Sequence, residues 1–167
     1  LDVAGDTRKY RLLSNVYSQM GMLYDYQNVY EEAIRMYEKA AEYKLLKGDS
    51  TSFSLVLRDI ARVYDMVDKN DSALLYFQKA AIIANETGNR HRYSGILTEL
   101  GDLYRELVMY DKALECLSES LKDSVGRNMY PTYSTLGHIY LEVGRLDSAD
   151  YYLRRCLDSP DLYVRDA

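Results

Sequence analysis

The feature that most constrains the fold of this chain is an internal repeat. Four tyrosines recur at intervals of 40, 40 and 36 residues: Tyr24, Tyr64, Tyr104 and Tyr140. Residues of the same kind accompany each tyrosine: a small residue three positions before it, an alanine nine after it, a bulky residue four beyond the alanine and a small residue three further on. These sets are Gly21, Ala61, Gly101 and Gly137; Ala33, Ala73, Ala113 and Ala149; Tyr37, Phe77, Leu117 and Leu153; and Ala40, Ala80, Ser120 and Cys156.

The spacing within each copy is that of packed helices. Residues three, four and seven positions apart share one face of an α-helix. Small residues let two helices approach closely, and bulky residues fill the opposing groove. Each copy is therefore predicted to be two antiparallel helices joined by a tight turn, and the hairpins must stack because one cannot bury its own apolar face. We expect an all-α, right-handed superhelix forming one domain over 1–167, with repeats near 14–50, 54–90, 94–128 and 130–160.

The pattern resembles the tetratricopeptide repeat (TPR), in which a large residue, a Leu-Gly pair, Tyr, Ala, Phe and Ala follow one another at fixed offsets. The first large residue of each copy is Tyr17, Leu57, Leu97 or Tyr133. The resemblance covers nearly the whole chain, and it implies a scaffold that binds proteins. The family's period is about 34 residues, so the longer spacing predicts longer helices.

The expected turns and helix ends contain suitable residues, with one exception. Acidic residues open the second helix of each repeat, where they favour the helix dipole: Glu31, Asp71, Asp111 and Asp147. Glycines separate the repeats: Gly48, Gly88 and Gly126. The turn inside each hairpin needs a residue that tolerates positive φ, and Asn28, Asp68 and Gly144 comply. Val108 occupies the same place in the third repeat, and we expect a distorted turn there.

Both ends of the chain have the pattern of interrupted repeats. Leu1–Gly5 is typical of the end of an earlier second helix followed by its glycine, and Pro160–Ala167 of the start of a further first helix. Neither end shows the polar cap that terminal repeats normally carry. We therefore expect the array to continue beyond both ends, or the chain to self-associate through them.

Composition and motifs exclude several function classes. A net charge of −5 argues against nucleic-acid binding, and no apolar run reaches the ~18 residues needed to insert in a bilayer. His91 and His138 fall in different repeats, and no metal-binding, phosphate-binding or nucleophile motif occurs. Cys116 and Cys156 stand at packing positions of second helices. We expect no cofactor, no metal and no catalysis.

The functional surface of such a stack is the groove along its first helices. The register predicts these ligand-groove residues: Asn15, Ser18, Arg58, Arg62, Thr98, Asp102, Arg105, Ser134 and His138. The same face also carries Met22, Asp25, Leu55, Asp65, Gly95, Pro131 and Leu141. Arg58 and Arg62 lie one turn apart, and with Arg105 they predict a site for an anion or carboxylate. The alternative is a row of salt bridges between repeats, involving Asp65 and Asp102.

The leading functional hypothesis is a non-catalytic scaffold that binds a protein or peptide in this groove. Chaperone-adaptor members of the family grip a C-terminal carboxylate with Lys and Asn, but Ser18 and Met22 stand at those positions here, which argues against chaperone binding. The alternative is a sensory or regulatory input domain of a larger bacterial protein. The long, tyrosine-rich repeats with "LDSADYYL" resemble the arrays of Bacteroidetes-type regulators, which implies a location outside the cytoplasm.

Overall fold

The computed structural model describes residues 3–122 and 129–157, with side chains from Asp6 onward. Over these residues the chain forms eight α-helices and no strand, which confirms the all-α prediction. The chain divides into two compact units, Leu1–Tyr93 and Ser94–Ala167, and each is described by itself. The handedness of the stack and its continuity as one domain stay predictions.

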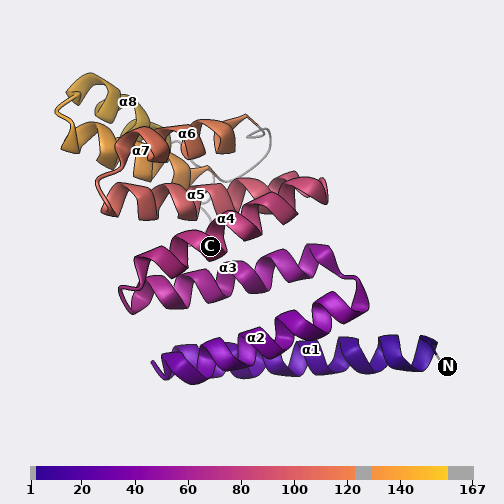
Figure 1. Ribbon diagram of the computed structural model, residues 1–167. Helices are drawn as coiled ribbons and strands as arrows, with labels where there is room; N and C mark the ends of the chain where they lie inside the picture. The colour runs from indigo at the N-terminus through magenta and orange to yellow at the C-terminus, as the bar shows by residue number, and fades with distance from the viewer. Residues whose placement is uncertain (1–2, 123–128, 158–167) are drawn as a thin grey trace, which may run out of the picture. The chain divides into compact units, whose positions relative to one another are not determined.

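The first unit contains two complete hairpins (Figure 1). Its helices are α1 (Val3–Tyr26), α2 (Tyr30–Lys47), α3 (Ser50–Met66) and α4 (Asn70–Glu86). Helix α1 packs against α2, α3 packs against α4, and α2 also packs against α3, so the second helix of one repeat supports the first helix of the next. The first turn of α5 (Arg90–Glu106) completes this unit.

The second unit holds the rest of α5 and three further helices. These are α6 (Tyr110–Leu121), α7 (Tyr130–Glu142) and α8 (Leu146–Leu157). Helix α7 packs against both α6 and α8. Gly126 and Pro160–Ala167 lie outside the described residues, so the expectations for them stay untested.

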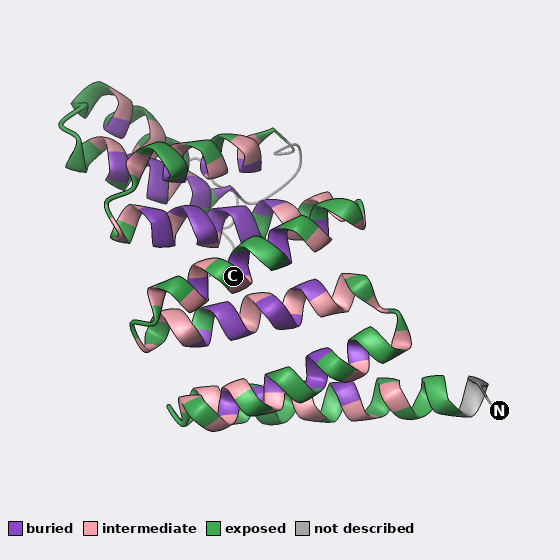
Figure 2. Cartoon of the chain, viewed as in Figure 1, coloured by how far each residue is buried: buried purple, intermediate pink, exposed green. Residues whose placement is uncertain are grey.

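Close approach of the two helices within a hairpin is confirmed by its glycines. A Cβ atom added at Gly21 would lie 2.6 Å from Cδ1 of Tyr37, and one added at Gly101 would lie 2.9 Å from Cγ of Leu117. Atoms this close overlap, so a larger residue would force the helices apart. All four repeat alanines, Ala33, Ala73, Ala113 and Ala149, are fully buried, and Figure 2 shows the buried positions recurring along one face of the helices within each unit.

The four hairpin turns are alike, so the distorted turn expected at Val108 is wrong. Val108 adopts a φ of 60°, beside 59° for Asn28, 56° for Asp68 and 74° for Gly144. Its amide donates to the carbonyl of Arg105 at 2.9 Å, the same bond that Asn28 makes at 2.9 Å to the carbonyl three residues before it. The packing of the two helices fixes the turn, and Val108 adopts a conformation that is strained for a β-branched residue.

The helix boundaries add one correction and one unforeseen cap. The helix end expected at Gly5 is absent, because α1 begins at Val3 and runs through Gly5 without a break. Between α2 and α3 the chain turns at Gly48, whose φ is 74°. Asp49 then caps α3, since its carboxylate accepts a hydrogen bond from the Ser52 amide at 3.1 Å.

Candidate ligand-binding site

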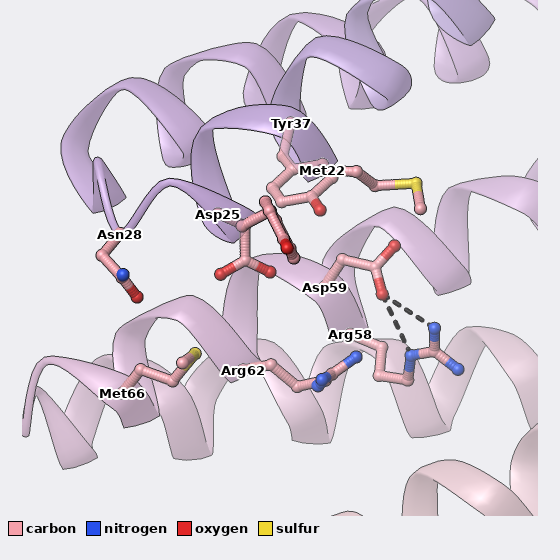
Figure 3. A pocket seen from close by; sticks show the side chains of 9 residues that line it. Met22, Asp25, Asn28, Tyr37, Arg58, Asp59, Arg62 and Met66 are labelled. Atoms are coloured by element: carbon pink, nitrogen blue, oxygen red, sulfur yellow. Dashed lines mark hydrogen bonds and ion pairs between the residues drawn. The ribbon is translucent and has the colours of Figure 1, made fainter.

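A cavity of about 520 Å³ opens in the first unit between α1 and α3. Figure 3 shows its side chains converging from three helices and the first turn. The lining residues are Met22, Asp25, Tyr26, Asn28, Tyr37, Arg58, Asp59, Arg62 and Met66. The cavity therefore lies on the seam between the first helices of two successive repeats, where the groove is predicted.

Helical periodicity explains which side chains reach the cavity. Met22 and Asp25 are three residues apart near the end of α1, and Arg58 and Arg62 are four residues apart on α3, so each pair shares a face. Tyr37 enters from α2, where its ring packs over Gly21. The sequence thus places Arg58, Arg62, Met22 and Asp25 on the groove face, and the structure brings these four together.

The charges of the cavity are mixed. Arg58 donates to Oδ1 of Asp59 from Nη2 at 2.8 Å and from Nε at 3.2 Å (Figure 3). Burial raises the pKa of the Tyr37 hydroxyl above its ordinary value, the negative charges of Asp59 and Asp25 raise it further, and the two arginines partly offset them. Two guanidinium groups and two carboxylates therefore act on the same small volume, and the carboxylates dominate at the Tyr37 hydroxyl.

Two further predicted residues of the first repeat lie outside this cavity. Asn15 on α1 accepts a hydrogen bond at 3.0 Å from Nζ of Lys44 on α2. Burial lowers the pKa of Lys44. A buried ammonium group needs hydrogen-bond partners, so Asn15 stabilises Lys44 within the hairpin. Ser18 is half-buried and does not line the cavity.

In the second unit the same seam is bridged by ion pairs. Arg105 on α5 donates to Asp102 at 2.9 Å, to Glu106 at 3.4 Å and to Glu142 of α7 at 3.2 Å. Thr135 of α7 also donates to Asp102, at 3.5 Å. Within this unit Arg105 thus joins two successive repeats. Its clustering with the arginines of the first unit stays a prediction, as does the groove as a whole.

Thr98 is placed differently from the prediction, because it is buried. Its hydroxyl lies 2.8 Å from that of Thr132 and 3.0 Å from that of Ser120, and Ser120 lies 2.8 Å from Ser94. These hydroxyl groups satisfy one another inside the unit, so Thr98 does not line an open groove. Ser134 is half-buried and His138 is exposed.

Other residues of the cavity were not foreseen as ligand-binding. Tyr37 had a signal, since it is the one tyrosine among the bulky packing residues of the second helices, and its hydroxyl distinguishes it from Phe77 and Leu117. Asp59 follows Arg58 directly and so falls off the groove face in a helical projection. Its side chain nevertheless lines the cavity, where it pairs with Arg58.

Stacked antiparallel hairpins with an open seam between first helices define a helical-repeat scaffold of the TPR type. A model of the family "Soluble NSF attachment protein, SNAP" matches residues 3–146, so the chain belongs to the SNAP family. Scaffolds of this repeat type are generally non-catalytic. No described helix combines the length and the apolar character that a membrane crossing requires.

Three solved structures share the fold. BtubC (BKLC) from P. vanneervenii is 20% identical with a TM-score of 0.79, over 89% of this chain and 63% of BtubC. MamA is 21% identical with a TM-score of 0.68, over 91% of this chain and 85% of MamA. PilF of Pseudomonas aeruginosa is 19% identical with a TM-score of 0.66, over 92% of this chain and 62% of PilF. The chain thus spans less than two thirds of BtubC and PilF, and no curated protein matches it.

Proposed function

We propose that this chain is a non-catalytic protein-binding scaffold that holds a short segment of its partner in the cavity of the first unit. The cavity carries this proposal because it combines an open volume, paired arginines and apolar side chains on one seam. Binding sites typically place a few polar groups within an apolar lining in this way. From the name of the SNAP family, which refers to attachment to NSF, the proposal takes only the class of activity, the holding of another protein.

The lining chemistry specifies the kind of segment. Arg62 and Arg58 can donate paired hydrogen bonds to a carboxylate, and Asp25 can accept from backbone amides or a basic group. The thioethers of Met22 and Met66 lie in the same cavity (Figure 3) and suit an apolar side chain, because methionine adapts to irregular partners. The segment we propose therefore carries an acidic residue next to an apolar one.

A peptide selection followed by titration tests this. A phage-displayed library of random peptides is panned against the chain, and the selected peptides are titrated against the wild type, Arg62→Ala and Asp25→Asn. Loss of a hydrogen bond to a charged group costs about 1.5–3 kcal/mol, so Arg62→Ala should bind roughly 10- to 100-fold more weakly. The control is Arg35→Ala, because Arg35 is an exposed arginine of α2, paired with Glu32, that lies outside the cavity.

Two outcomes separate the cavity from the scaffold. Selected peptides with acidic residues that lose affinity for Arg62→Ala but not for Arg35→Ala would support the cavity. Peptides that bind all variants equally would contradict the cavity as the site and leave the scaffold class intact. Because the two arginines face two carboxylates, we expect a smaller salt dependence than that of a purely basic site.

A second candidate is a sensory or regulatory input domain of a larger bacterial protein, of the Bacteroidetes type. It is favoured by the long, tyrosine-rich repeats and by the bacterial sources of BtubC and PilF. In that case the groove would hold a signal, and other parts of the protein would hold the output, with the domain outside the cytoplasm. Sequencing the gene on either side of the region for 1–167 tests it: a leader peptide, a membrane helix or a DNA-binding domain supports the regulator, and further repeats alone support the scaffold.

A further inference from the structure

Tyr37 is the only buried residue among those that line the cavity of the first unit. Its exposed fraction is 2%, and its ring packs over Gly21. Phe77 and Leu117 occupy the same repeat position in the next two repeats, with exposed fractions of 1% and 0%. An apolar side chain is therefore sufficient for packing at this position, and the hydroxyl of Tyr37 is not needed for it.

The hydroxyl of Tyr37 has no hydrogen-bond partner within the part of the chain that the structure describes. Buried polar groups in proteins are normally hydrogen-bonded. In Figure 3 the hydroxyl points toward the space between Asp25 and Asp59, which line the cavity with it. The cavity thus presents a polar atom that a ligand can reach and satisfy.

Asp25 of α1 offers a second such group beside Tyr37. Its side chain is half-buried, and it makes neither a hydrogen bond nor an ion pair with any other described residue. Asp59 differs, because Arg58 already pairs with it at 2.8 Å. The Asp25 carboxylate and the Tyr37 hydroxyl are therefore the acceptors that this side of the cavity has to offer.

The charge around Tyr37 selects the kind of group that binds there. The negative charges of Asp59 and Asp25 raise the pKa of the Tyr37 hydroxyl, and Arg62 and Arg58 offset this only in part. The potential at the hydroxyl is therefore negative, which repels a carboxylate and attracts a cationic donor. A lysine ammonium group is compact and carries three hydrogen-bond donors, so it can serve both acceptors at once.

We propose that the segment held in this cavity carries a lysine, whose ammonium group is bound by Asp25 and the Tyr37 hydroxyl. This inference rests on the proposed function and adds a second charge to the segment, beside the acidic residue that Arg62 binds. The segment then presents its basic group to α1 and its acidic group to α3. An acidic and apolar pair without a neighbouring lysine leaves Asp25 and Tyr37 unsatisfied and binds more weakly.

A directed peptide library tests the inference. The library fixes a Glu-Leu pair, randomises the flanking positions, and is panned on phage in parallel against the wild type and Asp25→Asn. Lysine should be enriched beside the pair with the wild type but not with Asp25→Asn, because asparagine keeps the shape of aspartate and loses its charge. The control is Asp71→Asn, an exposed aspartate of α4 in the same unit that does not line the cavity, and it should select lysine as the wild type does.

Titration then separates the two acceptors. A selected lysine peptide should bind Asp25→Asn about 10- to 100-fold more weakly, the scale of a hydrogen bond to a charged group, and Tyr37→Phe about 2- to 10-fold more weakly. The same peptide with norleucine in place of lysine should bind the wild type and both variants equally. Tyr37→Phe should melt as the wild type does, because Phe77 fills the same position in the next repeat.

The outcomes distinguish this inference from the proposed function. Peptides that depend on Arg62 but show no enrichment of lysine, or no loss on Asp25→Asn, would overturn the lysine site and leave the proposed function standing. Equal losses of the lysine and norleucine peptides on Asp25→Asn would also overturn it, since Asp25 would then support only the structure of the cavity. A library from which no peptide binds would contradict both.

Discussion

The two units use the same seam between successive first helices in opposite ways. In the first unit the seam of α1 and α3 holds an open cavity with Arg58, Arg62 and Asp25 on its walls. In the second unit Arg105 spans the seam of α5 and α7 and pairs with Glu142. Arg105 and Asp25 occupy the same repeat position. A long guanidinium side chain reaches across the seam of the second unit, whereas the first unit has a short carboxylate at the same repeat position.

The comparison shows that charge in a repeat groove does not by itself mark a ligand site. Arginine forms fork-like hydrogen bonds with any carboxylate within reach, whether of a ligand or of the next helix. In the described residues, a cavity opens at the seam of the first unit, and Arg105 joins the two helices at the seam of the second unit. The predictions below test that distinction, from the largest expected effect to the smallest.

The largest effect is expected from overfilling the hairpin contacts. Gly21→Leu and Gly101→Leu should each destabilise the fold by about 1–3 kcal/mol, because added atoms would overlap Tyr37 and Leu117. Chemical denaturation measures both. Only Gly21→Leu should also weaken peptide binding, since it displaces Tyr37, which lines the cavity. If Gly21→Leu and Gly101→Leu weakened peptide binding equally, the expected difference in peptide binding between the two units would be contradicted.

The strain in the hairpin turns can be tested by substitutions in both directions, valine to asparagine in the second unit and aspartate to valine in the first. Val108→Asn should stabilise the fold by about 1 kcal/mol, because asparagine adopts positive φ with less strain than valine. Asp68→Val in the first unit should destabilise it by a similar amount, since Asp68 has a φ of 56°. Thermal unfolding of the two variants checks the pair. If Val108→Asn were no more stable than the wild type, the backbone strain at this turn would be negligible.

The strut and the binding surface should respond differently to loss of an arginine. Arg105→Ala should lower the free energy of unfolding by about 1 kcal/mol, the scale of a partly exposed ion-pair network, and leave peptide affinity unchanged. Arg62 is more exposed than Arg105, so Arg62→Ala should change the free energy of unfolding less than Arg105→Ala does. Arg105→Lys is the matched control, because it keeps the charge but loses the fork. The reverse pattern, with stability lost at Arg62, would contradict the division of roles.

The smallest effect concerns the link between hairpins in the first unit. Burial by itself would raise the pKa of Asp49, but hydrogen bonds from Ser52 and Lys47 outweigh it and lower that pKa. A carboxylate with a lowered folded-state pKa stabilises the fold above its unfolded pKa of about 4 and loses that contribution as the pH falls. Asp49→Ala should cost about 0.5 kcal/mol at pH 7 and nearly nothing at pH 2. A difference independent of pH would contradict the ionic cap.

The repeat register could be predicted because it depends on local periodicity and on residue size. Gly21 faces Tyr37 and Gly101 faces Leu117, as the offsets indicate, because both helices of a hairpin are close in sequence and their contacts recur in each copy. The positive φ at Asn28 and Asp68 followed from turn chemistry in the same way.

Only the tertiary structure decided which individual polar side chains are buried and which partners they bind. Thr98, on the predicted groove face, is buried among hydroxyl groups of three helices, and Asn15 is bonded to Lys44. Val108 adopts the turn of its neighbours despite its side chain. Helical periodicity assigns a residue to a face, but whether that face meets a cavity, a carboxylate or another helix depends on ångström-scale distances between segments far apart in sequence. Those distances are set by the packing of whole hairpins, which no single repeat encodes.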